Sequence, residues 1–177
     1  VGTDAENPGA FNCGDDTVLT IISTDGAGIL NVGLYIHGDF KVAANLSVEG
    51  LVNIYKSLEV DSTSYAAPTF NGEVTVTDGG KLTVRHGNFR KDVTVESGGT
   101  LKMEENSCIQ NFTNSASNGS GGGVYVGRGS TMTMNGGTIK DCSASDGGGI
   151  YAAGAVVLNG GTISGCKAVG SYRSGGG

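Results

Sequence analysis

Carboxylates and imidazoles are the side chains with which this sequence could perform acid–base chemistry. Adjacent acidic residues occur at Asp15–Asp16 and at Glu104–Glu105, and the two histidines are His37 and His86. Hydrolysis of a glycosidic bond needs two carboxylates that reach one bond, whereas neighbouring residues in a strand point to opposite faces. The histidines lie far apart in the chain, without cysteine or acidic ligands at metal-binding spacing. We therefore expect surface acids and histidines, with no catalytic residue, metal or cofactor.

Four cysteines offer thiol chemistry, at Cys13, Cys108, Cys142 and Cys166. An even number permits disulfides in an oxidising compartment. Cys142 and Cys166 are 24 residues apart, and each follows an isoleucine by three residues. If that spacing is one turn of a coil, the two residues stack about 5 Å apart. Such a stack allows either a disulfide or two reduced thiols.

Repeats in the sequence indicate how these residues are positioned. The pentapeptide NGGTI occurs at Asn135 and at Asn159, and residues 69–84 align with residues 88–103 at a shift of 19. Farther upstream, Phe40 is related to Val52 by a shift of 12. Triple glycines begin at Gly121, Gly147 and Gly175.

Segments within the repeats alternate apolar and polar residues, as in VTV, LTV, LKM and TMTM. Alternation predicts strands with one buried face, and 33 glycines in 177 residues disfavour helices. A sandwich of hairpins would show spacings of about 8–12 residues with two-residue turns, and it does not explain identical residues that recur at 24. We predict an all-β fold, a single-stranded right-handed parallel β-helix of roughly eight short rungs.

We expect one β-helix domain over residues 1–177, in three parts. An irregular N-terminal cap covers 1–30, shorter-period rungs cover 31–103, and glycine-rich repeats cover 104–177. Met134 is expected to stack under Leu158. The expected core positions are Val74, Val76, Val93, Val95, Met132, Met134, Val156 and Leu158.

The segments GGGVYV…MNGGTIKDC and GGGIYA…LNGGTISGC resemble GGTI repeats of bacterial surface proteins, including autotransporter-like and polymorphic outer-membrane-type passengers and adhesins. The similarity covers residues 98–177. In that pattern an asparagine follows the isoleucine by three residues. Cys142 and Cys166 stand at this place, and Asn111 is expected to keep it. The resemblance implies a pectate-lyase-like β-helix that acts as an extracellular scaffold or adhesive stalk, and it carries over no catalytic residue.

Composition narrows the partners. A formal net charge of −6 argues against nucleic acid, whose binding needs clustered Lys and Arg. No apolar run approaches the roughly 18 residues that insert into a bilayer. The basic residues of the middle rungs alternate with acids, which is typical of an ordinary outer face. Candidate N-glycosylation sequons start at Asn45, Asn111 and Asn118.

These observations favour a non-enzymatic structural or adhesion module, at the cell surface or secreted, that binds a protein or glycan. The alternatives are a subunit of a self-assembling extracellular filament and a carbohydrate-active β-helix enzyme. The polar N-terminal segment leads us to expect a mature or trimmed product. Because a third GGG resembles the start of a unit, we expect further repeats or end-to-end association to cover Val156, Leu158 and Ile163.

Overall fold

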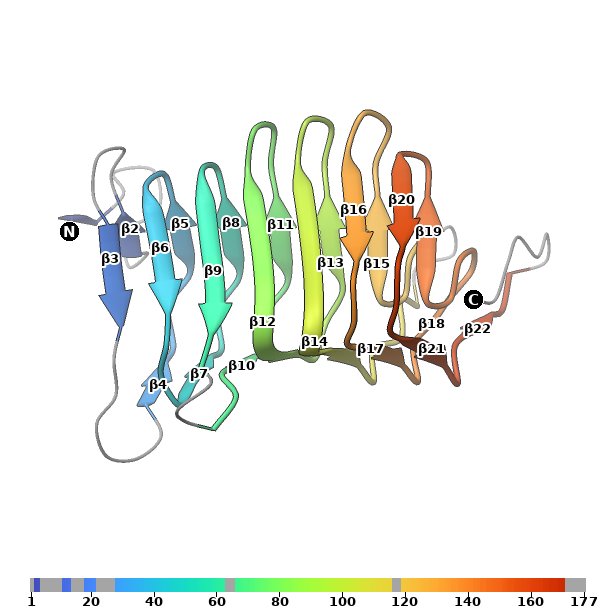
Figure 1. Cartoon of the computed structure of the whole chain (residues 1–177), viewed down its shortest axis with the longest axis horizontal. Coiled ribbons are helices and arrows are strands. Elements are labelled where there is room, and N and C mark those ends of the chain that lie inside the picture. Colours follow the sequence, from blue (N-terminus) through green and yellow to red (C-terminus); the bar gives the residue numbers. More distant parts are fainter. Residues whose placement is uncertain are drawn as a thin grey trace.

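The described residues form a β-solenoid, a coil of short strands that stack in parallel from turn to turn (Figure 1). A computed structural model describes residues 28–62, 66–115 and 119–170, together with the backbone of strands at 2–3, 11–13 and 18–21. Every element within these residues is a strand. The predicted all-β parallel coil is therefore confirmed.

One side of the coil is an eight-stranded sheet in which successive strands come from successive turns. Its neighbours pair in parallel, except for the outermost pair at the N-terminal end, which is antiparallel. From the first to the last, the seven parallel strands span about six turns of the coil, whereas we expected roughly eight rungs. In spatial order the strands are β1 (Gly2–Thr3), β2 (Phe11–Cys13), β5 (Leu34–Ile36), β8 (Val52–Ile54), β11 (Val74–Val76), β13 (Val93–Val95), β15 (Val124–Val126) and β19 (Ile150–Ala152).

A twelve-stranded sheet forms the other two sides of the coil and bends between them. Two long strands run through the bend, with an irregular register after Val84. The side facing the viewer in Figure 1 contains β3 (Val18–Ile21), β6 (Asp39–Val42), β9 (Ser57–Asp61), β12 (Lys81–Phe89), β14 (Thr100–Gln110), β16 (Thr131–Met134) and β20 (Ala155–Leu158). The lower side contains β4 (Gly28–Leu30), β7 (Leu46–Val48), β10 (Thr69–Phe70), β17 (Thr138–Lys140) and β21 (Thr162–Ser164). A separate pair joins β18 (Ser143–Ala144) to β22 (Lys167–Ala168).

The core consists of inward side chains that stack on their equivalents in the next turn. Phe70 lies on Phe89 with ring centroids 4.7 Å apart. Because side chains alternate along each strand, every second residue is inward, as the sequence predicted. Six of the expected core residues are buried: Val74, Val76, Val93, Val95, Met132 and Met134.

The last described turn departs from this pattern. Val156 and Leu158 pair in register with Met132 and Met134, as expected. Yet Val156 is only partly buried and Leu158 is 55% exposed, so the prediction that both are buried is wrong. The described residues place no further strand over this turn, and its inward side chains have a neighbour on one side only.

The repeat spacings of 19 and 24 residues each correspond to one turn of the coil, whereas the spacing of 12 residues does not. Val74 pairs with Val93 at the shift of 19, and Ile139 pairs with Ile163 at the shift of 24. Phe40, in contrast, pairs with Leu58 rather than with Val52. The 12-residue shift relates strands on different sides of the coil, which explains why too many rungs were expected.

A left-handed backbone corner recurs in three successive turns, at Asn111, Asp141 and Gly165, with φ of 61°, 54° and 66°. Asn, Asp and Gly are the residues that adopt this conformation most readily. Asn111 therefore aligns with Asp141, and Phe112 aligns with Cys142. The expectation that Asn111 occupies the cysteine position is wrong, because Asn111 follows its isoleucine by two residues and the cysteines follow by three.

Candidate functional site

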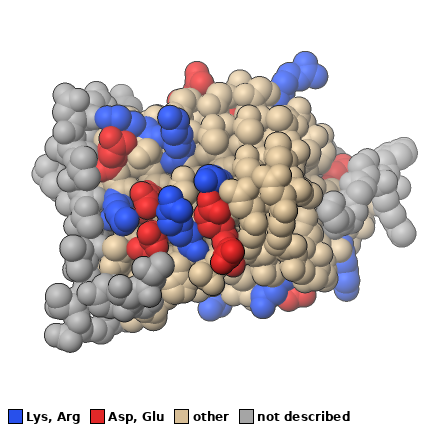
Figure 2. Space-filling model, viewed as in Figure 1, with Lys and Arg blue, Asp and Glu red and all other residues tan. Residues whose placement is uncertain are grey.

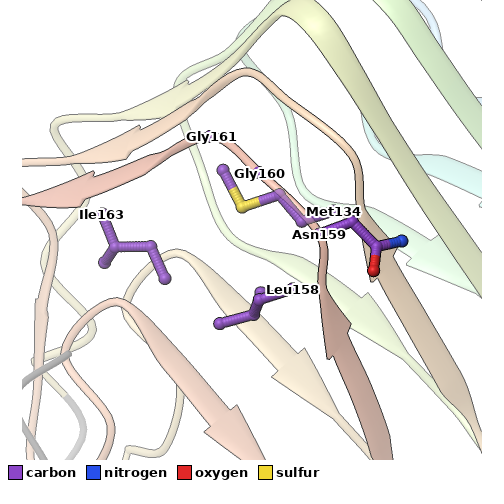
Figure 3. A pocket seen from close by; sticks show the side chains of 6 residues that line it. All are labelled: Met134, Leu158, Asn159, Gly160, Gly161 and Ile163. Atoms are coloured by element: carbon purple, nitrogen blue, oxygen red, sulfur yellow. The ribbon is translucent and has the colours of Figure 1, made fainter.

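The C-terminal face of the last described turn forms an open hollow of about 360 Å³ with both apolar and polar lining (Figure 3). Leu158 enters it from β20 and Ile163 from β21, while Met134 reaches it from the preceding turn. The rest of the lining is the corner between β20 and β21, formed by Asn159, Gly160 and Gly161. This hollow is the end of the coil's core.

Side chains that are covered in earlier turns are bare at this end. Met134 is 1% exposed, whereas Leu158, its equivalent one turn later, is 55% exposed. Within the described ranges, each strand of the last turn pairs on one side only, with the turn before it. A face that combines apolar core with unpaired strand edges is a template for another strand layer.

The NGG corners of the last two turns are in backbone-to-backbone contact. A Cβ on Gly160 would lie 2.6 Å from the carbonyl oxygen of Asn135, and one on Gly161 would lie 2.9 Å from that of Gly136. No side chain fits in such gaps, so the repeated NGG sequence is a requirement of stacking one corner on the next. The corners are also linked by a 2.9 Å hydrogen bond in which Asn159 Nδ2 donates to Asn135 Oδ1.

On the side of the coil that faces the viewer in Figure 2, charged side chains gather over the earlier turns, whereas the later turns are largely uncharged. Lys41 and Arg85 both contact Glu59, at 3.2 and 3.3 Å. Burial raises the pKa of the Glu59 carboxyl, but the hydrogen bonds and charges of these cations outweigh it and lower the pKa overall. Exposed pairs of this kind contribute little stability. The expectation of ordinary outer-face charge is therefore confirmed for these residues.

The predicted acidic and imidazole candidates do not assemble into one site. Asp15–Asp16 lies outside the described residues. Glu104–Glu105 lies within β14 at the bend of the sheet. A hydrogen bond from Lys102 lowers the pKa of Glu104. His37 stacks on Tyr55 with centroids 4.2 Å apart, and His86 Nδ1 lies 2.6 Å from the carbonyl oxygen of Ser62.

A stacked acidic pair that the sequence reasoning missed lies on another side of the coil. Glu73 and Asp92 directly precede the paired strands β11 and β13, which places them on adjacent turns. Burial raises the pKa of the Asp92 carboxyl, and the neighbouring Glu73 carboxylate raises it further. The signal was available, because the 19-residue shift aligns Glu73 with Asp92.

The cysteines of the last two turns are stacked thiols. Cys142 is buried, Cys166 is partly buried, and both are free. Burial raises the pKa of the Cys142 thiol to about 11, and the adjacent Cys166 adds to the rise. Cys108 is also free. It pairs in register with Thr138 and not with Cys142, so it lies outside this stack. The side chain of Cys13 lies outside the described residues.

The sequons differ in accessibility. Asn111 is exposed and Asn45 is partly buried, while Asn118 lies outside the described residues. Among the described residues, no three His, Cys, Asp or Glu side chains are grouped to hold a metal. The same residues contain no helix of the length and apolarity needed to cross a membrane.

The chain matches no protein-family model, and no curated protein or solved structure matches it.

Proposed function

We propose that this chain is a structural module of a cell-surface or secreted protein, a segment of β-solenoid that joins a further layer of strands at its C-terminal face. The observation that carries the proposal is the exposure of Leu158, 55% against 1% for Met134 in the equivalent place. Leu158 continues the column that contains Val84, Met103 and Met134, all of them buried. The core of the coil therefore runs through this face.

Stacked coils derive much of their stability from the interface between neighbouring units, so an uncovered unit is the least stable part of the array. A further layer would pair with the edges of β20 and β21 and exclude water from Leu158 and Ile163. Strand pairing and burial of apolar side chains already join the preceding turns, in which strands pair in register.

Placement outside the cell is supported by the resemblance of the NGGTI units to repeats of bacterial surface proteins. In that setting the lateral sides of the coil are the surface on which a protein or glycan would be bound. Scaffold and adhesive stalk are two uses of the same elongated body.

The test is to append a copy of residues 150–170 directly after Gly177, so that a strand follows the third triple glycine as it follows the first two. We expect a higher Tm and slower hydrogen exchange at the amides of β20 and β21. The matched control carries the same appended residues in scrambled order. Equal Tm and equal exchange for the two extended chains would refute the proposal.

A carbohydrate-active enzyme is the second candidate, and one observation favours it. Glu73 and Asp92 are acids on adjacent turns, and Asp92 has a raised pKa, as a general acid requires. Pectins and other acidic and neutral glycans are the substrates to assay, with Asp92→Asn as the test variant and Asp78→Asn as the control for an exposed acid. Cleavage that Asp92→Asn alone abolishes would establish the enzyme and overturn the scaffold proposal.

A further inference from the structure

A row of polar side chains crosses the later turns and ends at the open face. Lys102 Nζ lies 2.7 Å from Glu104 Oε1. Asn135 Nδ2 lies 3.4 Å from both oxygens of the same carboxylate, and Asn159 Nδ2 lies 2.9 Å from Asn135 Oδ1. Four side chains from three successive turns are thus linked, and Asn159 is the last of them.

The hydrogen bonds of this row converge on Glu104, and those of the two amides run toward it from the open end. The Glu104 carboxylate can only accept, and the bond from Lys102 keeps its pKa low, so that it is ionised at neutral pH. Asn135 must therefore turn its amide NH₂ toward Glu104, which leaves its Oδ1 toward Asn159. Asn159 in turn must direct its own NH₂ back to Asn135. The orientation of each amide is set by the carboxylate at the start of the row.

The consequence is that the open end presents an acceptor. With one N–H of Asn159 Nδ2 engaged by Asn135, the acceptor Oδ1 and the second N–H remain for a layer above, and no side chain within the described residues donates to Oδ1. Beside it, the backbone of Gly160 and Gly161 is open to close contact from a layer above, just as the backbone of Asn135 and Gly136 is in close contact with these glycines. Leu158 and Ile163 provide the apolar part of the same surface.

We propose that the C-terminal face selects a parallel strand layer with an apolar residue over Leu158, a side-chain amide donor over Asn159, and glycines over Gly160 and Gly161. The partner of that chemistry is a further NGG turn. The inference deepens the proposed function and rests on it. It adds that the face distinguishes a partner that donates a hydrogen bond to Asn159 from a partner that only accepts one.

A second copy of the chain fits this surface less well. Docked through its own C-terminal face, it would bring the same amide, so that the two Asn159 Oδ1 acceptors would face each other and only the second N–H of each Nδ2 would be left to donate. At the other end of the molecule, β1 runs antiparallel to β2 as the outermost strand of the eight-stranded sheet. Within the described residues, the eight-stranded sheet therefore does not offer at that end a parallel strand to continue β19.

The experiment uses three chains extended after Gly177, two of them with the copy of residues 150–170. In the first, the appended copy of Asn159 is kept, and in the second it is replaced by Asp, which has the same shape but only accepts when ionised. The third has the scrambled extension. We expect the Asp chain at pH 7 to lose about five- to tenfold in folding equilibrium constant relative to the Asn chain, through the missing donor.

Below the ordinary pKa of Asp, about 3.9, the appended carboxyl carries a proton and can donate, so the gap between the Asn and Asp chains should narrow. Equal stability of these two chains at pH 7, both above the scrambled chain, would overturn the inference and leave the proposed function intact. Equal stability of all three would refute the proposed function itself. Sedimentation of the unextended chain as a tight dimer that Leu158→Lys dissociates would also overturn the inference, because a second copy would then be the occupant.

Discussion

The same substitution, leucine to alanine, should have very different effects at Leu101 and at Leu158. Leu101 is fully buried and pairs in register with Leu82 on one side and Met132 on the other. Leu158 occupies the last described turn and is 55% exposed. Both side chains lie in the same sheet and point into the same core, so the comparison isolates the presence of a covering layer.

The magnitudes follow from burial. Leu101→Ala opens a cavity between two occupied turns and should cost about 2–5 kcal/mol of the free energy of unfolding. Leu158→Ala removes three carbons worth about 0.8 kcal/mol each when fully buried. With somewhat less than half of the residue buried and no closed cavity formed, the cost should be about 1 kcal/mol.

Urea denaturation followed by far-ultraviolet circular dichroism would give both values, provided that the m-values of the variants agree. In the chain extended by a copy of residues 150–170, the cost of Leu158→Ala should rise toward that of Leu101→Ala. Equal costs in the unextended chain would refute the reasoning, because they would mean that Leu158 is already covered.

Three further predictions concern the core and the titrating groups. Met134→Asp should prevent folding of the C-terminal turns, because it buries an unpaired charge, whereas Thr133→Asp on the outer face should be tolerated; thermal melts of the two variants distinguish these outcomes. Asp92→Asn should raise the Tm at pH 7, since burial raises the pKa of Asp92 and its ionised form opposes folding; in melts at lower pH the difference should shrink below the folded-state pKa and disappear below the unfolded value of about 3.8. Glu59 and Glu104 have lowered pKa values, so their stabilising effect is present above their unfolded pKa of about 4.5 and should be lost as the pH falls below it; a Tm that does not change between pH 6 and pH 3 would contradict this.

The repeat spacing in the sequence was enough to predict the fold and much of the register. A shift of 19 placed Val74 on Val93, and a shift of 24 placed Ile139 on Ile163, because identical residues recur where side chains stack. The 12-residue shift failed because a three-sided coil repeats its alternation on every side. Alternation alone does not tell one side of the coil from the next turn of the same side.

The candidate site was harder to predict, for two physical reasons. The exposure of Leu158 depends on whether a layer lies above it. The sequence does not show this, because Leu158 and Met134 both directly precede the pentapeptide NGGTI. The direction of the amide row depends on Glu104, which precedes Asn135 by 31 residues across an unusually long turn. The Glu73–Asp92 pair, in contrast, was visible in the alignment and was overlooked because only adjacent acids were considered.

Electron microscopy of the protein purified from its natural source would test most directly whether the C-terminal face is a joining surface. We predict a continuous rod in which parallel strands, about 4.8 Å apart, continue past β20 and β21 and cover Leu158. Particles in which the coil ends at these strands, with Leu158 facing solvent, would contradict it.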